Sequence, residues 1–497
     1  MEFRKKWNNI NNYTKYSLII ILSSLIIRFF LAFISIIGGD TCWHANVARY
    51  IANTGNIPIF EHLGRDFFWA PPLFHIFTAI VYKIFGPLGN IALNILPPIF
   101  GTLILLFSFL IIRKLFNAKI AFYSIIFFSF IPISLSVSST PYVDTLLGFF
   151  VLASIYYALE KKIMISSFFM GFGILTKYNA VFAIPAIFYI IYVNSKEIRK
   201  IFIKNIILFL FIAFAISSIW FLRNFYIFRN PIWPFFNNIF QGYPTIDETK
   251  IKFSINDLSR FYLETFGVPE GNLYNLQMVG NNFIIFVWIL LTIAFIIPFF
   301  IGLKNIKNKK SFNIINLILL FFILQQILVY IYAGFISPRW MIVAFISISI
   351  YWAFGLDYLI SKFCKYKTII FSTTIIIIFG FIFSMIERNI YANNLWRPYQ
   401  EDFDWIKKNT EKDALILAPP GQCYSFNLER FTVTTRYGNE NRVLITDEYI
   451  DKNIDYIFST KKSIVTSEFD ETIKDKFSKY KILYNNNKTG TVIYKVR

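Results

Sequence analysis

Apolar runs long enough to cross a bilayer recur along the chain between residues 17 and 386. A membrane-spanning α-helix needs about 20 consecutive apolar residues, and no soluble domain needs several such runs. The pattern therefore predicts a polytopic α-helical membrane protein with about eleven transmembrane helices. The expected spans are residues 17–37, 90–112, 120–138, 144–159, two short spans within 163–193, and then 205–222, 281–301, 313–333, 339–356 and 368–386.

The stretch between the first two spans predicts two shorter helices. Residues 41–53 form an amphipathic pattern that ends at Gly55. Residues 71–85 begin with Pro-Pro, which suits the first turn of a helix, but they are too few for a comfortable span. We expect both helices to lie at the membrane interface, in the first outer loop of the chain.

From residue 387 onward the long apolar runs end, and short segments that contain both apolar and polar residues follow. The segments DALILA, RFTVTT, YIFST and TGTVIYKV predict strands, and DFDWIKKN and ETIKDKFSKY predict helices. The sequence thus predicts two domains: a transmembrane domain at 1–386 and a small α/β domain at 387–497.

The formal net charge of +20 is distributed as in a membrane protein. Lys and Arg dominate the expected inner loops, whereas basic and acidic residues nearly balance in the tail. This pattern follows the positive-inside rule and does not indicate a nucleic-acid surface. It predicts a multi-pass cell-membrane protein in contact with membrane lipids, with a cytoplasmic N-terminus and an extracytoplasmic C-terminal domain.

Titratable residues concentrate on the side expected to be extracytoplasmic. All three histidines of the chain lie within residues 38–85. Dense titratable groups between membrane segments indicate where chemistry takes place. The candidates in the first outer loop are Asp40, His44, Arg65, Asp66 and His75, and those further along the chain are Asp144, Lys177, Arg223 and Arg339.

The three cysteines, Cys42, Cys364 and Cys423, do not form a disulfide framework by number or spacing. Cys42 and Cys423 would both lie on the outer side. The sequence does not decide whether a disulfide joins these two residues, because spacing alone cannot establish the required geometry.

Six segments in order resemble the GT-C superfamily of integral membrane glycosyltransferases, which use polyprenyl-phosphate sugars and include protein O-mannosyltransferases and aminoarabinose transferases. The segments are GGDTCWHANVARYIANTG, FFWAPPLFHIFTAIVYKIFG, STPYVDTLLGFF, GILTKYNAVFAIP, WFLRNFYIFRNPIWP and SPRW. The resemblance implies a GT-C fold and an inverting hexosyl- or mannosyltransferase-like enzyme. Its donor would be a polyprenyl-phosphate-linked sugar of the dolichyl-phosphate type, and its acceptor a hydroxyl of a protein, glycan or lipid.

The resemblance also implies a functional role for several residues, and each of these residues could instead have a purely structural role. Asp40 takes the place of the catalytic base, although it could equally cap the following helix. Asp144 would bind sugar or acceptor, or simply favour the start of its helix. The outer cations Lys177, Arg223, Arg339 and Arg65 would stabilise the leaving phosphate, or anchor the chain at the interface.

Cofactor use is open at this point. His44 lies near Asp40 in the sequence and would orient the base, bind sugar hydroxyls or ligate a metal. A divalent metal is therefore one of the alternatives, although the sequence has no metal-ligand spacing such as HExxH. Aminoarabinose transferases have a charged pair before Pro-Pro, where this chain has Trp69-Ala70. This difference weakens the case for a lipid A acceptor.

The alternative function is a polytopic transporter or flippase for a lipid-linked sugar. Transporters are commonly built from repeats and carry charged or broken helices at the bilayer midplane. The sequence shows no internal repeat, and its candidate groups lie at the outer rim. The pattern therefore favours the glycosyltransferase.

Overall fold

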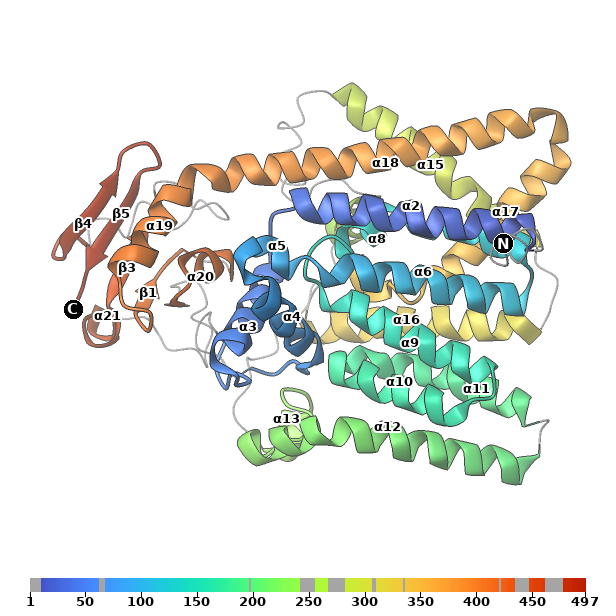
Figure 1. The fold of residues 1–497 in the computed structure, drawn as a ribbon, viewed down its shortest axis with the longest axis horizontal. Helices are drawn as coiled ribbons and strands as arrows, with labels where there is room; N and C mark the ends of the chain where they lie inside the picture. The colour runs from blue at the N-terminus through green and yellow to red at the C-terminus, as the bar shows by residue number, and fades with distance from the viewer. Residues whose placement is uncertain are drawn as a thin grey trace, which may run out of the picture.

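The computed structural model describes residues 10–61, 68–195, 198–241, 255–266, 282–305, 310–333, 336–419, 422–433, 447–460 and 477–497. Long helices run side by side in a bundle, and a small sheet stands beyond one end of it (Figure 1). Two candidate residues, Arg65 and Asp66, lie outside the described residues, as does most of the helix expected at 471–480.

The first half of the bundle follows the predicted order of helices. Its elements are α2 (Asn12–Ile34), α3 (Asp40–Thr54), α4 (Leu73–Phe85), η1 (Gly86–Leu88), α5 (Asn90–Leu93), α6 (Leu96–Leu115), α7 (Ala118–Phe130), α8 (Pro132–Val137), α9 (Val143–Leu159), α10 (Ile163–Thr176), η2 (Tyr178–Ala183) and α11 (Ile184–Asn194). Gly55 ends α3 in the left-handed region, with φ of 73°, which glycine adopts without a steric penalty. The expected break after Thr176 is also present, because Lys177 separates α10 from η2.

The second half continues the bundle. Its elements are α12 (Arg199–Phe228), α13 (Asn237–Phe240), α14 (Ile255–Phe266), α15 (Asn282–Asn305), α16 (Lys310–Ala333), η5 (Pro338–Met341), α17 (Phe345–Lys362), η6 (Cys364–Tyr366) and α18 (Lys367–Trp396). Among the described residues, five helical stretches are long and apolar enough to cross a membrane: Asn12–Ile34, Asn90–Leu115, Arg199–Phe228, Ser311–Ile331 and Cys364–Asn409. Shorter apolar helices, including Ala118–Phe130 and Val143–Leu159, pack among them.

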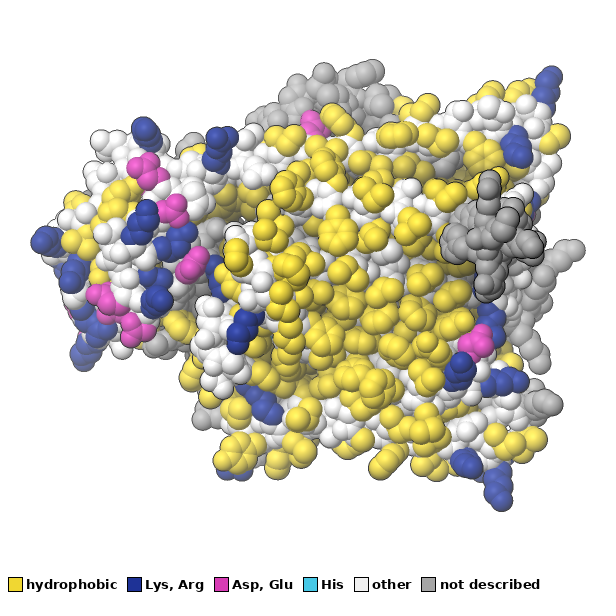
Figure 2. All heavy atoms as spheres, viewed as in Figure 1, with side chains coloured by type: hydrophobic (Ala, Val, Ile, Leu, Met, Phe, Trp, Pro, Cys, Tyr) yellow, Lys and Arg dark blue, Asp and Glu magenta, His cyan; other side chains and the backbone are white. Residues whose placement is uncertain are grey.

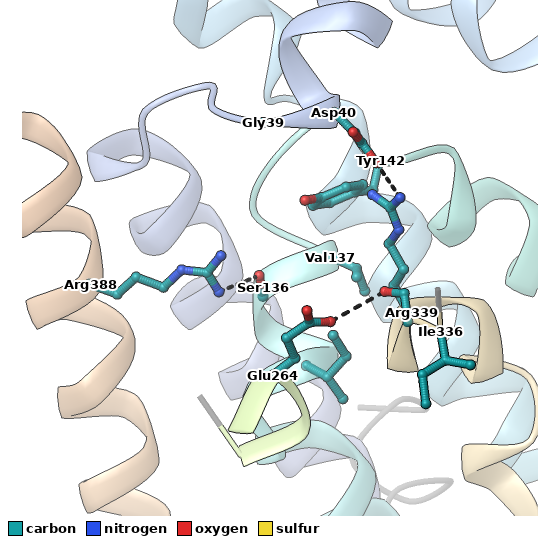
Figure 3. Close-up of a pocket in the computed structure, with 11 residues that line it drawn as sticks. Gly39, Asp40, Ser136, Val137, Tyr142, Glu264, Ile336, Arg339 and Arg388 are labelled. Carbon is teal, nitrogen blue, oxygen red and sulfur yellow. Dashed lines mark hydrogen bonds and ion pairs between the residues drawn. The ribbon is translucent and has the colours of Figure 1, made fainter. Parts of the chain in front are cut away.

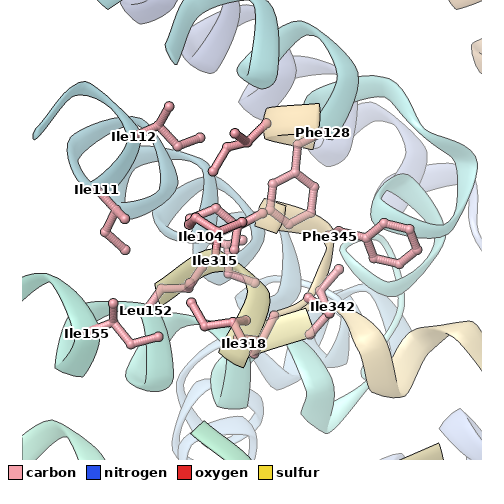
Figure 4. Close-up of a cluster of buried hydrophobic side chains, with 14 of the residues drawn as sticks. Ile104, Ile111, Ile112, Phe128, Leu152, Ile155, Ile315, Ile318, Ile342 and Phe345 are labelled. Atoms are coloured by element: carbon pink, nitrogen blue, oxygen red, sulfur yellow. The ribbon is translucent and has the colours of Figure 1, made fainter. Parts of the chain in front are cut away.

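Apolar side chains fill the bundle and also cover its outside. Figure 4 shows the interior, where Ile104, Phe128, Leu152, Ile315 and Phe345 from five segments meet. Figure 2 shows a broad apolar surface over the bundle, with charged side chains gathered toward its two ends. An apolar exterior between two charged rims is the surface that a bilayer requires.

The C-terminal part folds as a five-stranded mixed sheet with helices. Its elements are η7 (Arg397–Tyr399), α19 (Gln400–Asn409), β1 (Leu415–Leu417), α20 (Gln422–Leu428), β2 (Phe431–Val433), α21 (Asp447–Asn453), β3 (Tyr456–Ser459), β4 (Lys481–Asn486) and β5 (Thr491–Lys495). The strand order is β2-β1-β3-β5-β4, with β1 parallel to β2 and β3, and β5 antiparallel to β3 and β4. The predicted helical membrane fold with a small C-terminal α/β part is confirmed.

Two features bring the sheet and the first loop together at one end of the bundle. Helix α18 passes residue 386 without a break and leads through α19 into the sheet (Figure 1). Helix α20 packs against α3 at the same end. The short helices α3 and α4 therefore lie between the bundle and the sheet.

Candidate active site

Asp40 stands at the start of α3, directly after the Gly38-Gly39 turn. Gly39 adopts φ of 59° and ψ of −136°, a conformation that side-chain-bearing residues avoid, and this turn lets α3 begin at Asp40. The Asp40 carboxylate is half exposed and forms an ion pair with the Arg339 guanidinium. A carboxylate in the first turn is also favoured by the helix dipole. Asp40 is thus held in place but stays open to a ligand.

Arg339 lies in η5, within the Ser-Pro-Arg-Trp segment. Its guanidinium sits over the ring of Tyr142 at 4.9 Å and near the ring of Trp340 at 5.7 Å. These ring contacts restrain the side chain, because a planar guanidinium stacks well on aromatic faces. Arg339 therefore fixes the direction of the Asp40 carboxylate.

A second ion pair lies beside the first. Lys177 Nζ contacts Asp144 Oδ1 at 2.7 Å, and the Asp144 side chain is only 1% exposed. Lys177 also lies 5.5 Å from the Trp340 ring, the same ring that Arg339 approaches. Trp340 thus places both ion pairs in one site, although the four charged residues come from four segments of the chain.

Two histidines adjoin these ion pairs. His44 Nδ1 and His75 Nε2 lie 2.9 Å apart, so one ring donates a hydrogen bond to the other. Burial lowers the pKa of His75 to about 3. Burial also lowers the pKa of His44 well below its usual value, and the nearby His75, Arg339 and Lys177 add to this shift. Both rings are therefore neutral near pH 7 and suited to hydrogen bonding rather than to charge.

These pKa shifts predict a pH-dependent stability. An unfolded histidine binds a proton near pH 6.5, whereas His75 in the folded chain resists it down to about pH 3. Below pH 6.5 the unfolded state therefore binds more protons, and stability falls as pH falls, by up to about 1.4 kcal/mol per pH unit for each such histidine. Thermal unfolding in detergent between pH 7.5 and 5 should show a shallower slope for His75→Asn than for wild type. Equal slopes would contradict this prediction.

Arg223 lies on α12 and has different partners. It donates to the backbone oxygens of Pro58 and Phe68, at 3.1 and 3.3 Å, and stacks on Trp220 at 4.6 Å. It thereby ties the segment before α4 to the bundle. The structure therefore brings together six of the predicted site residues: Asp40, His44, His75, Asp144, Lys177 and Arg339. Arg223 instead stabilises the segment before α4 through hydrogen bonds to its backbone.

A pocket of about 340 Å³ opens beside Asp40 and Arg339 (Figure 3). It is lined by Gly39, Asp40, Ile133, Ser136, Val137, Tyr142, Glu264, Ile336, Ser337, Arg339 and Arg388. The candidates chosen from the sequence did not include the titratable residues Tyr142, Glu264 and Arg388 of this wall. Tyr142 precedes Asp144 in a segment already singled out, which was its available signal. Glu264 accepts from Ser337 Oγ at 3.4 Å, a contact between distant segments that no local pattern indicates.

No group of three or more His, Cys, Asp or Glu side chains in the described part of the chain is arranged to hold a metal ion.

A disulfide joins the site to the C-terminal part of the chain. Cys42, two residues after Asp40, is bonded to Cys423 of α20. Arg49 adds to the link, since it donates to the Phe426 backbone oxygen at 2.7 Å and pairs with Glu429 at 3.0 Å. The bridge that the sequence left undecided is present, and it links α20 to α3.

Breaking this disulfide should lower stability by about 2–4 kcal/mol, because it closes a very long loop in the unfolded chain. The test compares thermal unfolding of Cys42→Ser/Cys423→Ser with its Cys364→Ser parent, which removes the exposed free thiol. The parent should melt like wild type. A double variant that melts like the parent would show that the bridge contributes nothing.

Comparisons with known proteins agree on one fold. Residues 70–220 match the model of the dolichyl-phosphate-mannose-protein mannosyltransferase family. A comparison with the sequences of curated proteins finds no match. Among solved structures, ArnT from Cupriavidus metallidurans in the apo state aligns with a TM-score of 0.67 at 12% identity, covering 98% of this chain and 99% of that chain.

Two further structures have the same architecture. ArnT from Cupriavidus metallidurans bound to undecaprenyl phosphate aligns with a TM-score of 0.62 at 13% identity, covering 97% of this chain and 98% of that chain. The oligosaccharyltransferase of Archaeoglobus fulgidus aligns with a TM-score of 0.56 at 14% identity, covering 96% of this chain and 73% of that chain. These matches agree with the resemblance noted in the sequence and show that the chain has the GT-C fold of these membrane glycosyltransferases.

Proposed function

We propose that this protein transfers a sugar from a polyprenyl-phosphate donor to an acceptor hydroxyl at the extracytoplasmic face of a membrane. The observation that carries the proposal is the placement of Asp40 and Arg339 on the wall of one pocket. A carboxylate that can take a proton there stands beside cations that can balance a phosphate.

The donor class is supported by the matched proteins. The family model describes dolichyl-phosphate-mannose-protein mannosyltransferases, and one matched ArnT structure holds undecaprenyl phosphate. The family model also favours a hexose of the mannose type as the sugar. The acceptor is a protein, glycan or lipid hydroxyl.

The proposed reaction is a direct displacement at C1 of the sugar. Asp40 takes the proton of the acceptor hydroxyl as its oxygen bonds to C1 from one face. The bond between C1 and the phosphate oxygen breaks on the opposite face, and polyprenyl phosphate leaves with the electron pair. Attack and departure on opposite faces invert the configuration at C1. Such a positioned base typically contributes about 10²–10⁴-fold to the rate.

The neighbouring groups have supporting parts in this proposal. Asp144 is only 1% exposed, so its proposed part in binding the sugar is indirect: it would hold Lys177 in position at the rim of the site. The neutral His44–His75 pair would bind sugar hydroxyls through a ring nitrogen without repelling the cations.

The proposed orientation places residues 387–497 and the site outside the cytoplasm. The basic pair Arg113 and Lys114 ends α6 at the far end of the bundle from α3, as the positive-inside rule requires of the inner side (Figure 1). The Cys42–Cys423 disulfide gives independent support, because such bonds persist in oxidising compartments.

The test measures release of polyprenyl phosphate, since every sugar and acceptor would give this product. The full chain in lipid nanodiscs receives a panel of dolichyl- and undecaprenyl-phosphate hexoses together with a membrane extract as the source of acceptors. We expect release of polyprenyl phosphate only when donor and extract are both present, with sugar recovered on the acceptor. Movement of intact donor across the bilayer without bond cleavage would instead show a flippase.

A further inference from the structure

Three of the four cations that the sequence suggested for the leaving phosphate have protein partners in the structure, and the fourth, Arg65, lies outside the described residues. Arg339 pairs with Asp40, and Lys177 pairs with Asp144. Arg223 donates to backbone oxygens. A phosphate that bound Arg339 or Lys177 would compete with a carboxylate already in place.

Arg388 differs from these three cations. It projects from α18 into the pocket from the wall opposite Arg339 (Figure 3). Its Nη1 donates to the neutral Ser136 Oγ at 3.1 Å. No ion pair between described residues includes Arg388. Within the described chain, Arg388 is thus the pocket-lining cation that forms no ion pair, although the Glu264 carboxylate lines the same pocket and accepts a hydrogen bond from Ser337 Oγ.

A second arginine lies behind the same wall. Arg28 of α2 is fully buried, and its Nη2 donates to Ser134 Oγ at 2.9 Å. Its other recorded partner is the Ser24 backbone oxygen at 3.4 Å, and its Nε has no hydrogen-bond partner among the described residues. Ser134 and Ser136 are two residues apart on α8, so the two arginines approach this short helix from different sides.

Close packing holds Arg28 in this position. A Cβ added at Gly101 of α6 would overlap Ser138 Oγ and would lie 3.2 Å from Arg28 Nε, so the absence of a side chain makes room for both. Burying a cation without a counter-ion is costly, and an intramembrane arginine commonly marks a functional site. An anion in the pocket would lower the cost of both arginines at once, because fields are weakly screened in the interior.

We infer that Arg388 is the binding residue for the phosphate group of a polyprenyl-phosphate ligand, with Arg28 adding positive potential from behind α8. The inference rests on the proposed function for the identity of this ligand. It assigns the phosphate to Arg388 and leaves Arg339 in its contact with Asp40, so that the base stays oriented while the donor binds. A pocket of this volume falls in the range of small-molecule sites.

The surroundings of Arg388 favour a lipid phosphate over a free anion. Helix α18 belongs to one of the long apolar stretches and exposes Phe379, Phe383 and Ile390 on its surface. An isoprenoid tail could therefore lie along this helix in the bilayer while its phosphate reaches Arg388. An inorganic anion would gain nothing from that apolar surface.

The experiment measures ligand binding without turnover. The purified full chain in nanodiscs is titrated with undecaprenyl phosphate, undecaprenol and inorganic phosphate, and binding is followed by native mass spectrometry. Wild type should prefer undecaprenyl phosphate to both other probes. Arg388→Gln should weaken binding of undecaprenyl phosphate by about 10–100-fold, the loss expected for a charged hydrogen-bond donor, and Arg388→Lys should weaken it less.

The matched control is Arg397→Gln, which removes an exposed arginine just after the same helix. It should bind like wild type, and all variants should melt alike without ligand. Unchanged binding in Arg388→Gln with loss in Arg339→Gln would overturn the inference, as would inorganic phosphate binding as tightly as the lipid. Arg388-dependent binding without any sugar transfer would refute the proposed function and leave this site standing.

Discussion

Replacing Asp40 with Asn is expected to lower the turnover of sugar transfer by about 10²–10⁴-fold, because the amide cannot take the acceptor proton. The substitution keeps the shape of the side chain and its position at the start of α3. The Asp40 side chain is 50% exposed, and the Asn side-chain oxygen can still accept a hydrogen bond from the mostly buried Arg339, so the variant should still fold. The measurement is the rate of polyprenyl phosphate release at saturating donor.

The matched control for Asp40→Asn is Asp357→Asn. Asp357 lies on α17 and pairs with Lys119, outside the site, so this change should leave turnover intact. Thermal unfolding of both variants checks that they fold. If the folded Asp40→Asn variant turned over like wild type, Asp40 would not be the base, and its role would be structural, as a carboxylate at the start of a helix.

Local patterns predicted most of the long helices, because membrane helices are set by apolar length and by breaks in it. They missed the shorter helices α14, α20 and α21, and the span expected at 120–138 is divided into α7 and α8. The break at Lys177 and the end of α3 at Gly55 were both visible in the sequence. One strand, β4 at Lys481–Asn486, was missed. It is an edge strand whose side chains are mostly exposed or half-buried, so it lacks the apolar alternation that identifies a strand.

The contacts that assemble the site were beyond the reach of local patterns. Asp40 and Arg339 lie 299 residues apart, and Cys42 and Cys423 are separated by 381. Spacing along the chain carries no information on such pairings. Arg388 was overlooked for a different reason: it follows the last apolar run, where a basic residue usually marks the membrane boundary. In the structure, α18 continues past Arg388, and the Arg388 side chain lines the pocket.

Replacing Lys177 with Met is expected to lower the free energy of unfolding by about 3–5 kcal/mol, the cost of leaving a buried carboxylate without its partner. The Asp144 side chain is 1% exposed, so water cannot replace the lost ammonium group. Burial already opposes the charge of Lys177 and lowers its pKa, against the attraction of Asp144. The measurement is thermal and denaturant unfolding in detergent.

Two comparisons make this stability prediction specific. Asp144→Asn/Lys177→Met removes both charges and should recover much of the loss, because no unpaired carboxylate remains buried. Lys114→Met breaks a pair of similar length, with Lys114 Nζ 2.6 Å from Glu160, but both side chains are about one-third exposed. It should change stability by less than about 1 kcal/mol. Equal effects of Lys177→Met and Lys114→Met would mean that water reaches Asp144, and that the rim of the site is held by packing around Trp340 rather than by this ion pair.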